Sequence, residues 1–329
     1  MDNKITKKRL FDFLSYEWIA VIIVVVLSII AWELIYGITR VQVTPGQDFR
    51  VFYDVGLDNS QGEALNNYLY RKGAFSYDVL ELVDEGIVSD YEVLDIRIDA
   101  QEGDIIFTDK AQKGATVRAK HIIDRYPVYG LYDLLDDAKE YLRSFLKDGV
   151  TAENAELEFS NLDKAKIEAN FSNRLKKDNR IRKAKDRAEY LEKEYQRIEK
   201  LCIDTKDYEF FLENAPEEVF YKYTRFEQLS SVAAAENSGY GQYYIDLYGE
   251  WYQEEITAGR VDYAYGINME ALTGGEVNAS RYISKMSEAT AKDTVLVVFD
   301  MKVHQPDLQY ETVSFIAEIV RSFSNILSK

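Results

Sequence analysis

Hydrophobic positions are most concentrated over residues 18–38, where the chain reads WIAVIIVVVLSIIAWELIYGI. At about 1.5 Å per residue, a helix of this length can cross the roughly 30 Å hydrocarbon core of a bilayer. Glu33 is the only charged residue in the run, and Trp18, Trp32 and Tyr36 suit the membrane interfaces. Because the run has no polar face, the pattern predicts a transmembrane helix over 18–38 rather than a helix in a protein core.

The flanks of this segment predict its orientation. Basic residues precede it, namely Lys4, Lys7, Lys8 and Arg9, and such residues stay on the cytoplasmic side. Residues 1–17 are therefore expected in the cytoplasm and the rest of the chain outside. The alternative is a cleaved signal peptide, whose apolar core is usually about 7 to 15 residues long and ends at a small-residue site. The run is longer and lacks that site, so we expect a retained anchor in the cell membrane.

Beyond a connector at 39–48, apolar runs typical of buried strands alternate with amphipathic segments typical of helices. Strands are predicted at 50–57, 75–83, 104–109, 262–272 and 293–301, and helices at 59–73, from 89 to Gly103, at 131–149 and at 309–327. This alternation predicts an α/β domain with mostly parallel sheets. The domain, 49–329, is larger than one sheet usually needs, so two lobes are expected.

A charged segment at 173–202 interrupts the alternation. It is predicted to be helical, and it places opposite charges four residues apart at Lys185, Glu189 and Lys193. A solvated helix is the simplest interpretation. The alternative is a surface for a partner protein, for anionic headgroups or for wall polymers.

Composition excludes several classes of function. A formal net charge of −17 disfavours nucleic acid as a partner. One cysteine, Cys202, permits neither an intrachain disulfide nor a thiolate zinc cluster, and the histidines, His121 and His304, are far apart in sequence. No P-loop or nucleophile elbow is present, and residues 54–63 fail the spacing of a calcium loop. We therefore predict no enzyme, no cofactor and no metal site.

Three short segments follow one another along the chain in an order that is typical of a known family. They are the turn and strand containing Gly103, Asp104, Ile105, Ile106 and Asp109, then Tyr265, Gly266, Ile267 and Asn268, and finally Glu311, Phe315 and Ile316 in the last helix. This order, over residues 48–325, resembles the extracytoplasmic solute-binding proteins of bacterial ABC importers. Each motif is common by itself, and the order carries the resemblance. It implies a two-lobed periplasmic-binding-protein-like fold and a permease partner in the same membrane.

More narrowly, the chain resembles membrane-anchored, binding-protein-like sequences of Gram-positive bacteria that carry a basic helix in mid-chain. Arg180, Arg182 and Lys183 stand at that position here. The departure from ordinary binding proteins is the protein helix in place of a lipid anchor. Such a tether favours a partner within the same membrane.

Ligands of α/β folds bind beyond the carboxyl ends of the strands. That rule selects Tyr53 and Asp54 after the first strand, and Thr108 and Asp109 after the third. A carboxylate there can accept hydrogen bonds from sugar hydroxyls or pair with a cationic ligand. The alternative is an aspartate that caps the following turn or helix.

Aromatic residues are a second source of candidates, since the chain has 25 tyrosines and a cluster of them at 239–252. Aromatic faces with a polar tip suit sugar rings or peptides, although the same spacing also forms an ordinary packing stripe. We single out Trp251, within the cluster, and Tyr265, near a predicted strand end, as ligand contacts.

The sequence thus predicts a membrane-tethered extracytoplasmic module that binds a carbohydrate or other small polar solute in a cleft between lobes. One alternative is a structural or assembly component of a membrane complex, whose cleft is filled by its own side chains. Another is a polysaccharide enzyme, which would need two carboxylates roughly 5 to 10 Å apart in a groove.

Overall fold

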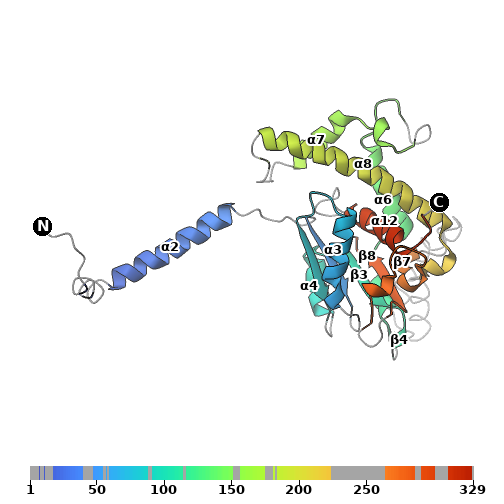
Figure 1. Cartoon of the computed structure of the whole chain (residues 1–329), viewed down its shortest axis with the longest axis horizontal. Helices are drawn as coiled ribbons and strands as arrows, with labels where there is room; N and C mark the ends of the chain where they lie inside the picture. Colours follow the sequence, from blue (N-terminus) through green and yellow to red (C-terminus); the bar gives the residue numbers. More distant parts are fainter. Residues whose placement is uncertain are drawn as a thin grey trace, which may run out of the picture.

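A computed structural model gives the fold (Figure 1). It describes residues 7, 11, 18–39, 47–54, 57, 59–87, 91–113, 116–150, 156–174, 181, 184–223, 264–285, 290–300 and 310–327. These residues form a mixed α/β domain, as predicted, with one long helix, α2 (Trp18–Thr39), before it.

The domain is built on a six-stranded sheet with the order β2-β1-β3-β8-β7-β6. The strands are β1 (Asp48–Tyr53), β2 (Glu81–Gly86), β3 (Ile105–Asp109), β6 (Phe220–Lys222), β7 (Ala264–Asn268) and β8 (Thr294–Val298). β1 pairs in parallel with β2 and β3, whereas the pairings β3–β8, β8–β7 and β7–β6 are antiparallel. The prediction of mostly parallel sheets is therefore wrong.

The connections explain the two halves of the sheet. Parallel strands are joined by crossover connections. Helix α3 (Gly62–Lys72) lies in the crossover from β1 to β2, and α4 (Glu92–Asp99) lies in the crossover from β2 to β3, on the other side of β1. After β7 the described chain contains only the short turns η6 (Met269–Ala271) and η7 (Ala279–Arg281) before β8, so the chain returns antiparallel.

Two further strands, β4 (Gln112–Lys113) and β5 (Thr116–Val117), form a separate antiparallel pair. The described ranges hold no second large sheet of the kind that the expected two lobes would need.

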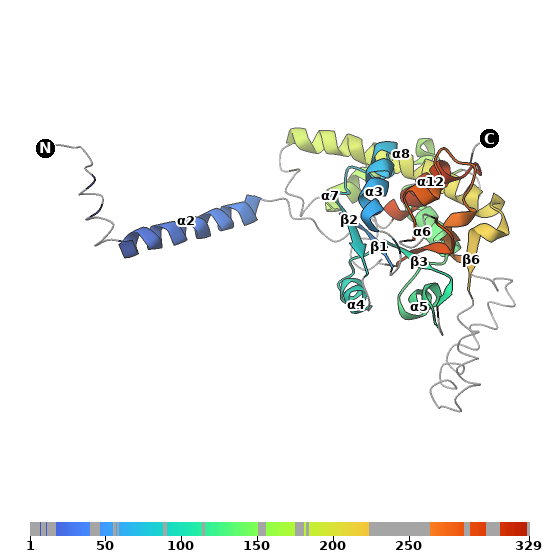
Figure 2. The same ribbon diagram turned by 60° about the horizontal axis from the view of Figure 1, so that its bottom comes forward.

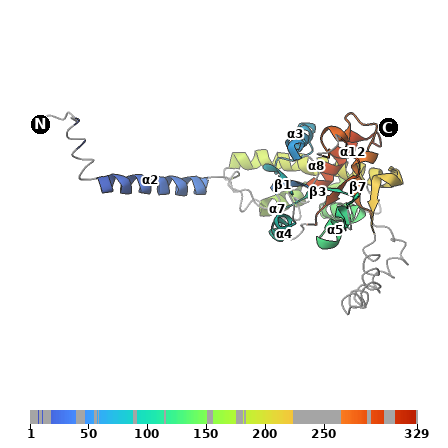
Figure 3. The ribbon, with the colours of Figure 1, turned by 90° about the horizontal axis from the view of Figure 1, so that it is seen from below.

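Helices cover both faces of the sheet (Figures 2 and 3). One face carries α3, α6 (Leu131–Arg143), α8 (Ala184–Asn214) and α12 (Glu311–Phe323), and the other carries α4 and α5 (Arg118–Arg125). Side chains alternate between the faces along β1, so Val51 and Tyr53 join the first core and Phe52 the second. Helix α3 ends at Gly73, whose φ of 81° is left-handed, as the predicted stop at this glycine requires.

The charged segment at 173–202 is only partly the solvated helix that was predicted. It contains the end of α7 (Lys164–Arg174) and the first part of α8, while 175–180, 182 and 183 lie outside the described residues, among them Arg180, Arg182 and Lys183. The predicted Glu189–Lys193 pair is present at 2.8 Å on the exposed face. One turn later α8 packs against α6 and α12, and it buries Arg197 there. The solvated interpretation therefore holds only for its beginning.

Helix α2 lies apart from the sheet domain in all three views (Figures 1 to 3). Its large apolar side chains are exposed, and Ile19, Leu27 and Leu34 are among those exposed by more than half. Counting only described residues, no helix combines the length and the apolar character needed to cross a membrane.

Candidate functional site

The sheet order places a topological switch point at the carboxyl ends of β1 and β3, and we call this place the crevice. The chain leaves β1 toward β2 on one side, and it returns to β3 on the other side of β1. At such a switch point the connections diverge, and open α/β sheets bind their ligands there. Asp54 follows β1, and Thr108 and Asp109 end β3, so three of the residues selected from the sequence lie at this crevice.

Asp54 is the centre of this site. Its backbone N–H donates to the carbonyl of Phe107 at 2.9 Å, which holds it against β3. The Thr108 hydroxyl donates to Asp54 Oδ2 at 2.7 Å. The Asp54 side chain has no exposed surface, so its carboxylate needs compensation from the protein.

Arg118, the first residue of α5, supplies this compensation. Its Nε donates to Asp54 Oδ2 at 2.8 Å, and its Nη2 donates to Oδ1, which makes a two-pronged contact. These hydrogen bonds to Asp54 raise the pKa of Arg118 above its ordinary value. The Arg118 side chain is still 19% exposed, so the pair lies at the edge of the interior rather than in its centre.

Two aromatic rings lie in a row next to Arg118. The guanidinium lies 4.9 Å from the ring centre of Tyr91, and the His121 ring lies 4.5 Å beyond it. Burial raises the pKa of Tyr91 to about 12. Burial, followed by the charges of Arg125 and Arg118, lowers the pKa of His121, so its imidazole is neutral at pH 7.

The polar atoms of these rings are the unusual feature of the site. Tyr91 Oη and His121 Nε2 are buried, and neither has a hydrogen-bond partner within the described part of the chain. Buried polar atoms in folded proteins almost always have a partner, which is often a bound water or ligand. They are two of ten such atoms among the described residues, and their place beside the Asp54–Arg118 pair distinguishes them from the others.

Asp109 has a different surrounding. Its Oδ1 accepts from the Ala111 N–H at 2.8 Å, which is the turn-capping alternative for this aspartate. It also forms an ion pair with Lys285 at 3.3 Å, and Lys285 reaches Asp293 at 3.5 Å. These contacts tie the segment around Lys285 to the end of β3.

Tyr53 points to the opposite side of the sheet from Phe52 and stacks on Phe107, with ring centres 5.4 Å apart. Its partner across the parallel pair is Gly86 of β2. Two residues earlier in β2, the half-buried Asp84 accepts a hydrogen bond from Asn66 Nδ2 at 2.9 Å. Burial raises the pKa of Asp84 to about 6.

The remaining candidates lie elsewhere. Tyr265 lies near the start of β7, in the core under α4 and α5, whereas the residue of β7 level with Thr108 is Asn268. Trp251 and His304 fall outside the described residues. Among described side chains, no group of His, Cys, Asp and Glu is arranged to hold a metal ion.

Sequence reasoning missed Arg118 and Tyr91 and gave His121 only a default role. The three come from two segments that no motif connects, although the spacing of Ala119, Ile122 and Ile123 is that of an amphipathic helix. The nearest signal is Arg118 and His121 three residues apart, which share one face of a helix.

Comparison with known proteins adds no assignment, since no family model matches the chain and neither a curated protein nor a solved structure is similar to it.

Proposed function

We propose that the protein is a membrane-tethered binding module that holds a small polar solute in the crevice between β1 and β3. The observation that carries this proposal is the pair of unpartnered buried atoms, Tyr91 Oη and His121 Nε2, beside the Asp54–Arg118 ion pair. Because Asp54 and Arg118 neutralise each other, the site favours an uncharged ligand. A phenol and a neutral imidazole together donate to and accept from hydroxyl groups, as a carbohydrate or another polyol requires.

The finer assignment, a diverged extracytoplasmic solute-binding protein, belongs to the same proposal. The order β2-β1-β3 is that of doubly wound folds that bind ligands at this crevice. In support of it, Gly103 and Asp104 precede β3, and Glu311 begins the terminal helix α12. Permease subunits of an ABC importer are the partner that this assignment implies.

The membrane anchor is also proposed, with the N-terminus in the cytoplasm and the α/β domain outside. Its support is α2, a single helix whose described apolar side chains are exposed along its length. In water this exposure would be unfavourable, at roughly 25 cal/mol for each Å² of apolar surface. A bilayer removes this cost.

A structural or assembly role is the second candidate, and a specific observation favours it. Arg118 and Thr108 already satisfy Asp54, and Lys285 pairs with Asp109, so much of the crevice chemistry is internal. Both carboxylates are engaged by cations, so these two are not the free acid and base pair that a polysaccharide enzyme needs.

A binding screen separates these candidates. The full chain in nonionic detergent is heated with sugars, polyols, amino acids and peptides, and we expect the polyol or sugar class to raise the midpoint of unfolding. A ligand at 100 times its Kd stabilises by about 2.7 kcal/mol. If no class stabilises the chain, the structural role is favoured instead.

Two variants locate the effect. Tyr91→Phe keeps the ring and removes only the hydroxyl, so it should weaken the affinity for the solute by about five- to tenfold. It should leave the ligand-free protein as stable or more stable, because the lost hydroxyl has no partner. Tyr132→Phe, at an exposed tyrosine of α6, is the matched control and should not change binding. Equal affinities for all three proteins would contradict the proposed site.

A further inference from the structure

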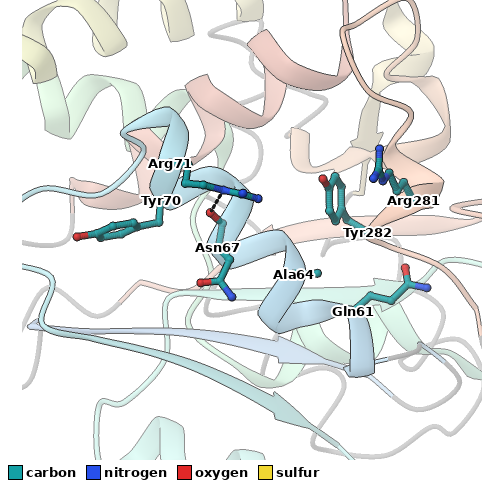
Figure 4. A pocket seen from close by; sticks show the side chains of 7 residues that line it. All are labelled: Gln61, Ala64, Asn67, Tyr70, Arg71, Arg281 and Tyr282. Atoms are coloured by element: carbon teal, nitrogen blue, oxygen red, sulfur yellow. Dashed lines mark hydrogen bonds between the residues drawn. The ribbon is translucent and has the colours of Figure 1, made fainter.

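A concave surface lies along α3 (Figure 4). Its other wall is η7 and the residue after it, and its volume is about 690 Å³. Pockets that bind small molecules usually have about 300 to 1,000 Å³. We call this surface the α3 groove, and it is lined by Gln61, Ala64, Asn67, Tyr70, Arg71, Arg281 and Tyr282.

The charge of the α3 groove is opposite to that of the protein. Its lining contains two arginines and no carboxylate, although the chain has 57 acidic residues and a net charge of −17. A local positive surface on such an acidic protein attracts anions to one place and leaves the rest of the molecule repulsive to them.

Neither arginine is neutralised by the described residues. Arg71 Nε donates to the carbonyl of Asn67 at 3.2 Å, and the Arg281 guanidinium lies 5.7 Å from the ring centre of Tyr282. No ion pair with a described carboxylate involves either of them, whereas the neighbouring Lys72 pairs with Glu276. Both side chains are exposed, so their donors face a possible ligand rather than the interior.

The wall that carries Arg281 is held in place. Tyr282 is buried, and its ring stacks on Tyr68 with centres 5.1 Å apart and planes 26° apart. It also lies 6.3 Å from Phe323 of α12. Figure 4 shows Arg71 reaching from α3 toward Tyr282, with Arg281 on the far side of that ring. The two guanidinium groups therefore flank an ordered aromatic wall, which lowers the entropy lost when a ligand binds.

We infer that the α3 groove binds the phosphate ester of a polyol. Guanidinium groups fit phosphate oxygens with two parallel hydrogen bonds, and Arg71 and Arg281 each offer such a group to the groove. The side-chain amides of Gln61 and Asn67 offer donors and acceptors for the hydroxyls of the polyol. The same chemistry occurs in soluble polyol phosphates and in the headgroup of phosphatidylglycerol.

The test measures binding of glycerol 3-phosphate to the full chain in nonionic detergent by calorimetry. Glycerol serves as the probe without phosphate, and mixed micelles containing phosphatidylglycerol represent the lipid source. Arg71→Gln and Arg281→Gln should each weaken binding about tenfold, and the double variant about a hundredfold, because each removes hydrogen bonds to a charged group. Both residues are exposed, so the variants should keep the unfolding midpoint of the parent.

Arg143→Gln is the matched control, since Arg143 is an exposed arginine in the last turn of α6, outside the groove. It should change the Kd less than twofold. Binding of glycerol 3-phosphate that depends on both groove arginines supports the inference with a soluble ligand. The same dependence seen only with phosphatidylglycerol supports it with the lipid as the source. No binding of either probe, or equal binding by the parent and the double variant, overturns it.

Discussion

Arg197 and Arg118 each bind a buried carboxylate, yet their surroundings differ. Arg197 of α8 contacts Glu194 at 2.9 Å, Glu311 of α12 at 3.6 Å and the hydroxyl of Tyr141 at 2.9 Å, and its side chain is 4% exposed. Arg118 is 19% exposed, and polar atoms without described partners lie next to it. A buried ion pair alone does not indicate a ligand site, so the proposed site rests on the unsatisfied neighbours of Arg118 at the sheet crevice.

The location of the two arginines agrees with this difference. The Arg197 network joins α8 to α6 and α12 within the helical layer, and Tyr77 completes it by donating to Glu194 at 2.8 Å. Arg118 instead begins a helix at the carboxyl ends of the parallel strands. We therefore expect substitutions at Arg197 to change stability alone and substitutions at Arg118 to change both stability and binding.

The largest effect is expected from Arg197→Met. It leaves Glu194 and Glu311 buried without their cation, so the free energy of unfolding should fall by about 3–5 kcal/mol. Urea denaturation measures the change. Lys193→Met, which breaks the exposed pair with Glu189, is the control and should change the free energy of unfolding far less, because water screens this pair. A loss at Arg197 as small as that of the control would show that the network does not hold α8 in place.

Arg118→Met should lower the free energy of unfolding by about 2–4 kcal/mol, because Asp54 then loses its ion pair. The double variant Arg118→Met with Asp54→Asn removes both charges and should recover most of this loss. Stabilisation by a solute should not return in the double variant. If the double variant still binds the solute, the Asp54–Arg118 ion pair serves stability alone, as the Arg197 network does, and the difference between the two arginines is contradicted.

The smallest effect concerns Asp84, a half-buried carboxylate that has an amide partner in Asn66 and a pKa raised to about 6. Its pKa in the unfolded chain is about 3.9, so the native state holds its proton more tightly between pH 4 and pH 6. Stability from this group is thus present below pH 4 and is lost as pH rises through 6.

Asp84→Asn removes this dependence and keeps an oxygen that can accept from Asn66. Relative to the parent, the variant should be more stable at pH 7 than at pH 4 by about 1 kcal/mol, since water still screens a half-buried carboxylate. Chemical denaturation of both proteins at the two pH values measures the difference. If the variant and the parent differ in free energy of unfolding by the same amount at both pH values, the raised pKa is contradicted.

Part of the fold could be predicted because its signals are local. The runs at 104–109 and 293–301 formed β3 and β8, and Gly73 stopped α3. The direction of β8 could not be predicted, because it depends on where the chain returns to the sheet and not on the residues of the strand. Gly266 is a similar case. A Cβ there would lie 2.4 Å from Val295 Cγ1, so only the packed sheet reveals why glycine is needed.

The candidate site shows the same division. The sequence by itself determined that Asp54 and Thr108 follow buried strands, because alternating apolar runs and polar ends are readable along the chain. Only the tertiary structure decided that these two residues meet Arg118, Tyr91 and His121, because β1 and β3 become neighbours through a crossover and α5 folds back over their ends. Hydrogen bonds between distant segments depend on this three-dimensional closeness, which no spacing in the sequence records.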